Sequence, residues 1–103
     1  MINKSESEKL IEEGKFVEVI DEFYIDCFEK IKEVLDFFKI KYEDNITLIE
    51  CISLIDTFVP NGEIITYFPV EIFFVESREI DSRARFALNW YDKWLVNLEE
   101  IKK

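Results

Sequence analysis

The sequence predicts a mostly α-helical fold, a small bundle of about four helices, in a single domain that spans residues 1–103. Three observations support this prediction. Apolar residues recur at helical spacing over most of the chain. No repeat or low-complexity linker interrupts it, and its two glycines, Gly14 and Gly62, sit where the helical patterns break. The stretch at 60–76 lacks a clear helical pattern, so we expect an irregular or partly extended segment there.

The first two helices are predicted at residues 6–13 and 15–39. Ser5 and Glu8 have the spacing of a capping box, which would start the first helix. Gly14 is a typical residue to end it. In the second helix the apolar residues fall on one side and the acidic residues on the other. This stretch is therefore predicted to be strongly amphipathic, with one face in the core.

A third helix is predicted at 46–58, where Thr47 and Glu50 form another possible capping box. Many residues of this stretch are β-branched, and the Pro-Asn-Gly sequence that follows would also suit a hairpin turn. The apolar run after that turn is rich in strand-forming residues, but Pro69 excludes one continuous central strand. The alternative of an α+β fold, with a small antiparallel sheet from 46–76, therefore stays open.

The last helix is predicted at about 80–100, with Asp81 or Ser82 near its start. Phe86 and Trp90 lie close together around this helix and away from its small apolar residues. Most aromatic residues in a chain of this size belong to the core, but these two are candidates for exposure. An exposed aromatic face on this helix would suit self-association.

The second helix carries an acidic stripe. Its six carboxylates recur at steps of four, four, three, four and three residues, and a helix gathers such positions within a sector of about 80°. Like charges four residues apart each cost an isolated helix roughly 0.2 to 0.5 kcal/mol, so the stripe opposes its own helix unless something cationic lies alongside. The six residues are Glu18, Glu22, Asp26, Glu29, Glu33 and Asp36.

The overall charge of the chain narrows the choice of partner. The net charge is -10, which argues against binding to nucleic acid or to an anionic membrane surface, because such binding depends on Lys and Arg. A basic protein is the natural complement. No apolar run approaches the roughly 18 to 20 residues that cross a bilayer, and the N-terminus lacks the apolar region of a signal peptide. We therefore expect a cytoplasmic protein.

The residue types present do not predict catalysis. The chain has no histidine and none of the common nucleotide, hydrolase or metal motifs, so we expect no enzyme activity, no cofactor and no metal site. Cys27 and Cys51 lack the spacing of a zinc site and fall at positions predicted to face the core. They are expected to be buried, reduced thiols.

Two interpretations of the acidic stripe remain. It is either a solvated face, partly neutralised by Arg78, Arg83 and Arg85, or a docking surface for a cationic groove. A docking surface of this kind would speed association by long-range attraction and could occupy a site that normally holds phosphates. A nuclease or another nucleic-acid enzyme is then the obvious class of target.

Residues 60–69 have the sequence Pro-Asn-Gly-Glu-Ile-Ile-Thr-Tyr-Phe-Pro. This segment is similar to a signature of the nuclease-colicin and pyocin immunity proteins. In that family a Pro-Asp-Gly sequence is followed by Leu-Ile-Tyr-Tyr-Pro, with the two prolines at the same separation as here. Ile64 stands where the family has an acidic contact residue. The matching residues are Pro60, Gly62, Tyr67 and Pro69, with Asn61 and Phe68 as close replacements.

The resemblance implies a four-helix plan and an acidic inhibitor that blocks a bacterial nuclease toxin. It implies that the inhibitor docks through its helix carboxylates and through Tyr67 and Phe68. The function expected from the sequence is therefore that of an immunity, antitoxin or anti-defence protein. The alternative is a structural or regulatory helical module that forms a homodimer through Phe86 and Trp90.

Overall fold

The structure, a computed structural model, describes residues 3–74 and 79–103; the side chains of residues 68, 70, 71 and 74 lie outside this description. Within the described residues the chain forms five helices and no strand, so the predicted helical bundle is confirmed and the α+β alternative is wrong. The helices are α1 (Lys4–Glu12), α2 (Phe16–Phe37), α3 (Leu48–Phe58), α4 (Glu63–Phe74) and α5 (Ile80–Ile101).

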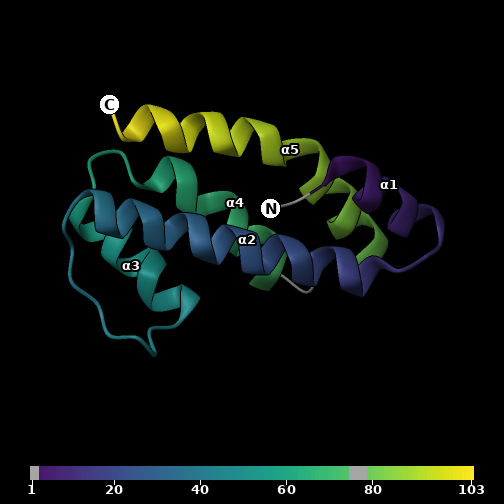
Figure 1. Cartoon of the computed structure of the whole chain (residues 1–103), viewed down its shortest axis with the longest axis horizontal. Coiled ribbons are helices and arrows are strands. Elements are labelled where there is room, and N and C mark those ends of the chain that lie inside the picture. Colours follow the sequence, from purple (N-terminus) through teal and green to yellow (C-terminus); the bar gives the residue numbers. More distant parts are fainter. Residues whose placement is uncertain (1–2, 75–78) are drawn as a thin grey trace.

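The longest helices, α2 and α5, set the shape of the bundle. Figure 1 shows α2 along the long axis, α5 above it, α1 near one end and α3 below it. α2 contacts all four other helices, and α5 contacts α1, α2 and α4. None of the described helices is both long and apolar enough to span a bilayer.

α1 starts earlier than the sequence predicted. Asn3 is its N-cap, and the Asn3 side-chain oxygen accepts a hydrogen bond from the backbone N–H of Ser5 at 3.0 Å. The predicted capping box of Ser5 and Glu8 is therefore wrong, because an asparagine two residues upstream already satisfies the free N–H groups. Gly14 ends the helix as expected: its φ is 75°, and the next N–H, of Lys15, donates back to the helix.

α3 begins with the predicted capping box. The N–H of Glu50 donates to Oγ1 of Thr47 at 3.2 Å, and Oε1 of Glu50 accepts from the N–H of Thr47 at 3.3 Å. These two bonds satisfy free N–H groups at the start of the helix. The capping box prevails over the β-branched composition, since its bonds form within four residues whereas strand pairing would need a second strand beyond the turn.

The described part of 60–76 is not irregular or extended, because Glu63–Phe74 forms α4 with Pro69 inside it. Pro69 has no N–H, so the carbonyl of Ile65 loses the donor that an ordinary helix would supply. The indole N–H of Trp94, on α5, donates to that carbonyl at 2.6 Å. All three residues are buried. A contact from another helix thus compensates for the hydrogen bond that Pro69 removes.

The turn between α3 and α4 depends on Gly62. A Cβ atom at Gly62 would lie 2.5 Å from the carbonyl oxygen of Ile55, in the last turns of α3. The N–H of Gly62 donates to the carbonyl of Val59 at 3.0 Å. Only glycine therefore allows α4 to start this close to α3.

α5 buries more aromatic area than its pattern predicted. Trp90 is only 5% exposed and Phe86 is half-buried, so the expectation of an exposed Trp90 is wrong. Three other helices contact α5, which widens its apolar face beyond a single stripe. Its N-cap is Glu79, without a side-chain cap bond, and Asp81 and Ser82 lie near its start, as predicted. The aromatic surface on which the homodimer hypothesis depended is correspondingly reduced.

Candidate functional site

The candidate site is the outward side of α2, and the structure exposes five of its six predicted carboxylates. We call these five the acidic face. They lie on the side of the helix that the other four helices leave uncovered, because the apolar positions of α2 supply much of the core. The acidic face consists of Glu18, Glu22, Glu29, Glu33 and Asp36.

Asp26, the sixth carboxylate, is buried, so its predicted place on the exposed stripe is wrong; it is 6% exposed. At about 100° per residue, Asp26 lies at one edge of the acidic sector. Phe23 and Lys30 lie farther around the helix in the same direction, and they line a cavity with Lys4 of α1 and Tyr91 of α5. The packing of α1 and α5 on this side therefore covers Asp26.

The burial of Asp26 has an electrostatic consequence. Its Oδ2 atom has no hydrogen-bond partner among the described residues. Loss of solvation on burial raises the pKa of the Asp26 carboxyl, while the positive charge of Lys30 acts in the opposite direction. Asp26 is therefore a source of instability near neutral pH rather than part of a docking surface.

The described arginines do not neutralise the acidic face. Arg83 and Arg85 form no ion pair with its carboxylates, and the guanidinium carbon of Arg85 lies 6.0 Å from the centre of the Phe16 ring instead. Arg78 lies outside the described residues. Within the described residues, the one ion pair of the acidic face joins Glu33 to Lys30 at 3.6 Å.

The other carboxylates of the face differ in their contacts. Asp36 accepts a hydrogen bond from the Tyr42 hydroxyl at 2.9 Å, and this bond raises the pKa of Tyr42. Glu18, Glu22 and Glu29 have no ion-pair or hydrogen-bond partner among the described residues. Three carboxylates thus face solvent without a compensating charge from the described part of this chain.

Ile25 is a site residue that the sequence reasoning missed. It is 59% exposed, and it lies between Glu22 and Glu29, one turn from each along α2. Its position around the helix lies about 20° beyond the edge of the acidic sector, on the side away from Asp26, and not on the apolar side. That departure from amphipathic spacing is the signal that could have identified it. An exposed isoleucine beside these carboxylates offers an apolar contact at the edge of a charged surface.

Tyr67 lies on a different helix from the acidic face. It is 64% exposed and sits on the side of α4 opposite to Ile65 and Ile72, which are buried in the core. α4 touches α2, since the rings of Tyr24 and Phe73 meet edge to face with centroids 5.4 Å apart. The side chain of Phe68 lies outside the described residues, so only one of the two predicted aromatic contacts can be placed.

The two thiols are both buried, as predicted, and both are free. Burial raises the pKa of Cys27, with a further contribution from the charge of neighbouring Asp26, and burial also raises the pKa of Cys51. Neither thiol is therefore available as a thiolate nucleophile near neutral pH. Among the residues that the structure describes, no three His, Cys, Asp or Glu side chains are grouped to hold a metal ion.

No family model, no curated protein and no solved structure matches this chain. The likeness to immunity proteins thus remains a local one, over residues 60–69, which form the α3–α4 turn and the first half of α4. The functional argument depends on the surface that the chain presents.

Proposed function

We propose that this protein is an acidic inhibitor of the immunity, antitoxin or anti-defence kind, which binds a nuclease or another nucleic-acid enzyme and occludes its basic site. The observation that carries the proposal is the acidic face of α2, in which Glu18, Glu22 and Glu29 are exposed without a partner from the described residues. Like charges at this spacing weaken a helix, so a complementary partner gives the arrangement a physical reason.

The dimensions of the face suit a groove that binds nucleic acid. Glu18 and Asp36 are eighteen residues apart, which places them about 27 Å apart along the helix axis. A cationic groove that holds a phosphate backbone would meet a row of carboxylates of comparable reach. The net charge of -10 would also attract a basic enzyme from a distance and raise the association rate.

Apolar contacts would then hold the complex after the charges have aligned it. Ile25, at the edge of the face, and Tyr67, on α4, are the exposed residues that support this step. The resemblance to immunity proteins implies a contact at Tyr67 and at Phe68. An inhibitor of this kind would act in the cytoplasm, before or after its target enzyme reaches nucleic acid.

The test compares two charge-reversed variants that alter the net charge equally. Glu22→Lys/Glu29→Lys reverses the acidic face, whereas Glu12→Lys/Asp44→Lys reverses two exposed acids elsewhere. A partner captured from the native host with the unaltered protein is then used for kinetics. We expect the acidic-face variant to associate about tenfold more slowly than the control at low salt, with the difference shrinking at high salt. Equal association rates for the two variants would refute the proposal.

A further inference from the structure

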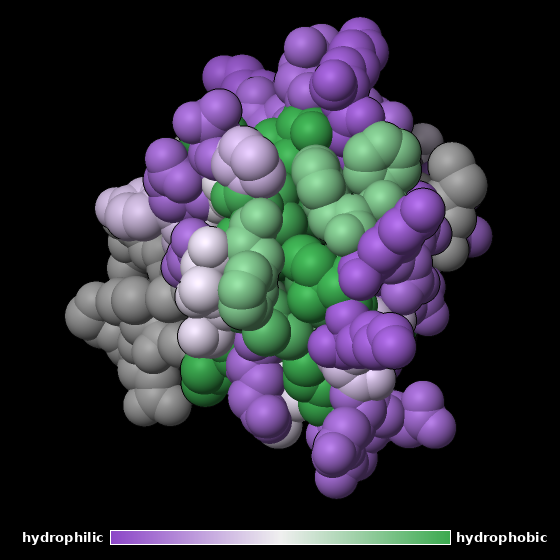
Figure 2. Space-filling view, turned by 90° about the vertical axis from the view of Figure 1, so that its left-hand side faces the viewer, coloured by the Kyte–Doolittle hydropathy of each residue, from purple (hydrophilic) through white to green (hydrophobic). Residues whose placement is uncertain are grey.

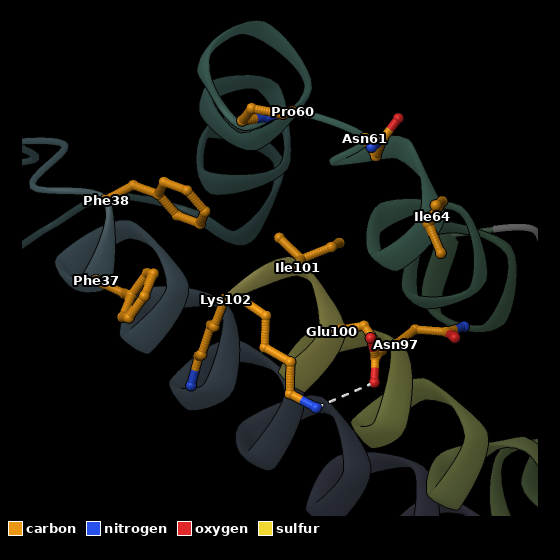
Figure 3. Close-up of a pocket in the computed structure, with 10 residues that line it drawn as sticks. Phe37, Phe38, Pro60, Asn61, Ile64, Asn97, Glu100, Ile101 and Lys102 are labelled. Atoms are coloured by element: carbon orange, nitrogen blue, oxygen red, sulfur yellow. Dashed lines mark hydrogen bonds and ion pairs between the residues drawn. The ribbon is translucent and has the colours of Figure 1, made fainter.

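A second surface lies at the end of the bundle where α2 and α5 both terminate. Figure 2 looks onto this end and shows an apolar area surrounded by hydrophilic residues. It contains a cavity of about 590 Å³, within the range of about 300 to 1,000 Å³ that ligand pockets occupy. Its apolar wall includes Phe37, Phe38, Ile64 and Ile101 (Figure 3). Phe37 is 53% exposed and Ile64 is 46% exposed, so the wall is open to a partner.

Several groups at this cavity attract a cation, although Lys102 and Lys103 also belong to its lining. α2 ends at Phe37 and α5 ends at Ile101, so two helix C-termini border it, each with a partial charge of about -0.5. The rings of Phe37 and Phe38 meet edge to face with centroids 5.1 Å apart, and aromatic ring faces attract cations. Asn61 and Asn97 add polar amide side chains to the lining.

The lysines at the cavity are already paired. Lys103 contacts Glu100 at 3.3 Å, and Lys102 contacts Glu99 at 3.6 Å. The pair of Lys103 and Glu100 is solvent-exposed and separated by only three residues, so it is weak and can be exchanged for a better partner. An incoming cation can therefore replace Lys103 at the Glu100 carboxylate.

We infer that this cavity receives an arginine side chain from a loop of the basic protein that the acidic face binds. The identity of the partner rests on the proposed function, whereas the preference of the cavity for a cation with an apolar stem rests on its own lining. Arginine fits better than lysine because its planar, weakly hydrated guanidinium stacks on aromatic rings and forms two parallel bonds with a carboxylate. Its aliphatic stem would pack against Phe37 and Ile64 while its guanidinium reaches Glu100.

The first measurement uses small probes on the full chain. N-acetyl-arginine methylamide is titrated while backbone amide signals are followed by NMR, alongside the lysine and leucine analogues. We expect saturable shifts at Phe37, Ile64 and Ile101, with affinity for the arginine probe about fivefold or more above that for the leucine probe. Equal binding of the leucine probe, shifts confined to the acidic face, or no shifts at all would each overturn the inference.

Matched variants then assign the contacts. Phe37→Leu keeps an apolar side chain but removes the ring, and Glu100→Gln keeps the shape but removes the charge; both residues are exposed, so folding should be preserved. Each is expected to weaken arginine binding about threefold or more. The controls Phe58→Leu and Glu12→Gln make the same changes at exposed positions outside the cavity and should leave binding unchanged. Equal effects of variants and controls would overturn the assignment.

The inference about the cavity and the proposed function can be refuted independently of each other. Glu29 is eight residues, about 12 Å along the axis, from Phe37, which exceeds the screening length of about 8 Å at physiological salt. Glu22→Lys/Glu29→Lys should therefore leave binding of the arginine probe unaltered while slowing association with the partner. If the probe does not bind but the association rate still depends on the acidic face, the cavity inference alone is wrong. If the probe binds and the association rate does not depend on that face, the proposed inhibitor function is wrong.

Discussion

At the scale of single residues, the hydrogen bond between Trp94 and Ile65 explains how a helix with a central proline is stable. The indole N–H supplies the donor that Pro69 lacks, in a buried position where an unpaired carbonyl is costly. Trp94 and Pro69 should therefore be coupled energetically although they belong to different helices.

We predict that Trp94→Phe destabilises the protein by about 1 to 3 kcal/mol, because it leaves the Ile65 carbonyl unpaired and shrinks a buried side chain. In a Pro69→Ala background, the new N–H of residue 69 can bond to the same carbonyl, so the same change should cost about 1 kcal/mol less. Denaturant unfolding of the four proteins measures the coupling. An equal loss in both backgrounds would contradict the compensation.

Asp26 makes stability depend on pH. Because burial raises its pKa in the folded state above the ordinary value of 3.8, the folded protein binds more protons than the unfolded chain between these two pKa values. The free energy of unfolding contributed by this group therefore falls as pH rises through that window, and the loss is complete above the folded-state pKa.

We predict that Asp26→Asn gains stability relative to the unaltered protein as pH rises from 3.8 towards neutrality, because asparagine carries no buried charge. The difference between the two free energies of unfolding should vanish or reverse below that range. Urea unfolding at a series of pH values measures it. A difference that does not change with pH would show that the carboxyl is not strained by burial.

At the scale of helices, local signals predicted most elements and missed one. α2 was predictable from its apolar spacing, and α3 from Thr47 and Glu50, because both signals act within a few residues. α4 was not predictable, because the donor that replaces the N–H missing at Pro69 comes from Trp94. Trp94 is 29 residues along the chain from Ile65, whose carbonyl accepts the hydrogen bond. The acidic side of α2 was likewise predictable, whereas the burial of Asp26 depends on where α1 and α5 pack.

The α3–α4 turn provides a test at this scale. We predict that Gly62→Ala destabilises the fold by about 1 to 3 kcal/mol, since its Cβ would collide with the backbone of Ile55 and force α4 to shift. At Asn61, which has a φ of 60°, Asn61→Gly should be tolerated or slightly stabilising. Thermal unfolding measures the stability of both variants. A Gly62→Ala variant as stable as the unaltered protein would mean that the turn is looser than described.

At the scale of the whole molecule, the acidic face should lower the stability of the free protein while it favours binding to a basic partner. We predict that Glu22→Lys/Glu29→Lys is as stable as the unaltered protein or more stable at low salt, because like-charge pairs costing roughly 0.2 to 0.5 kcal/mol each become attractive ones. Thermal unfolding at several salt concentrations checks this, and the gain should shrink as salt screens the charges. A marked loss of stability would indicate that these carboxylates support the fold.

The hydrogen bond from Trp94 to Ile65 also affects the order in which the helices dock while the chain is being synthesised. A ribosome releases α4 well before the residue that completes its hydrogen bonding, because that residue follows 29 positions later. Until the C-terminal segment emerges, the nascent α4 carries an unpaired carbonyl, that of Ile65, in its first turn. Its docking should therefore be among the last events in forming the native protein.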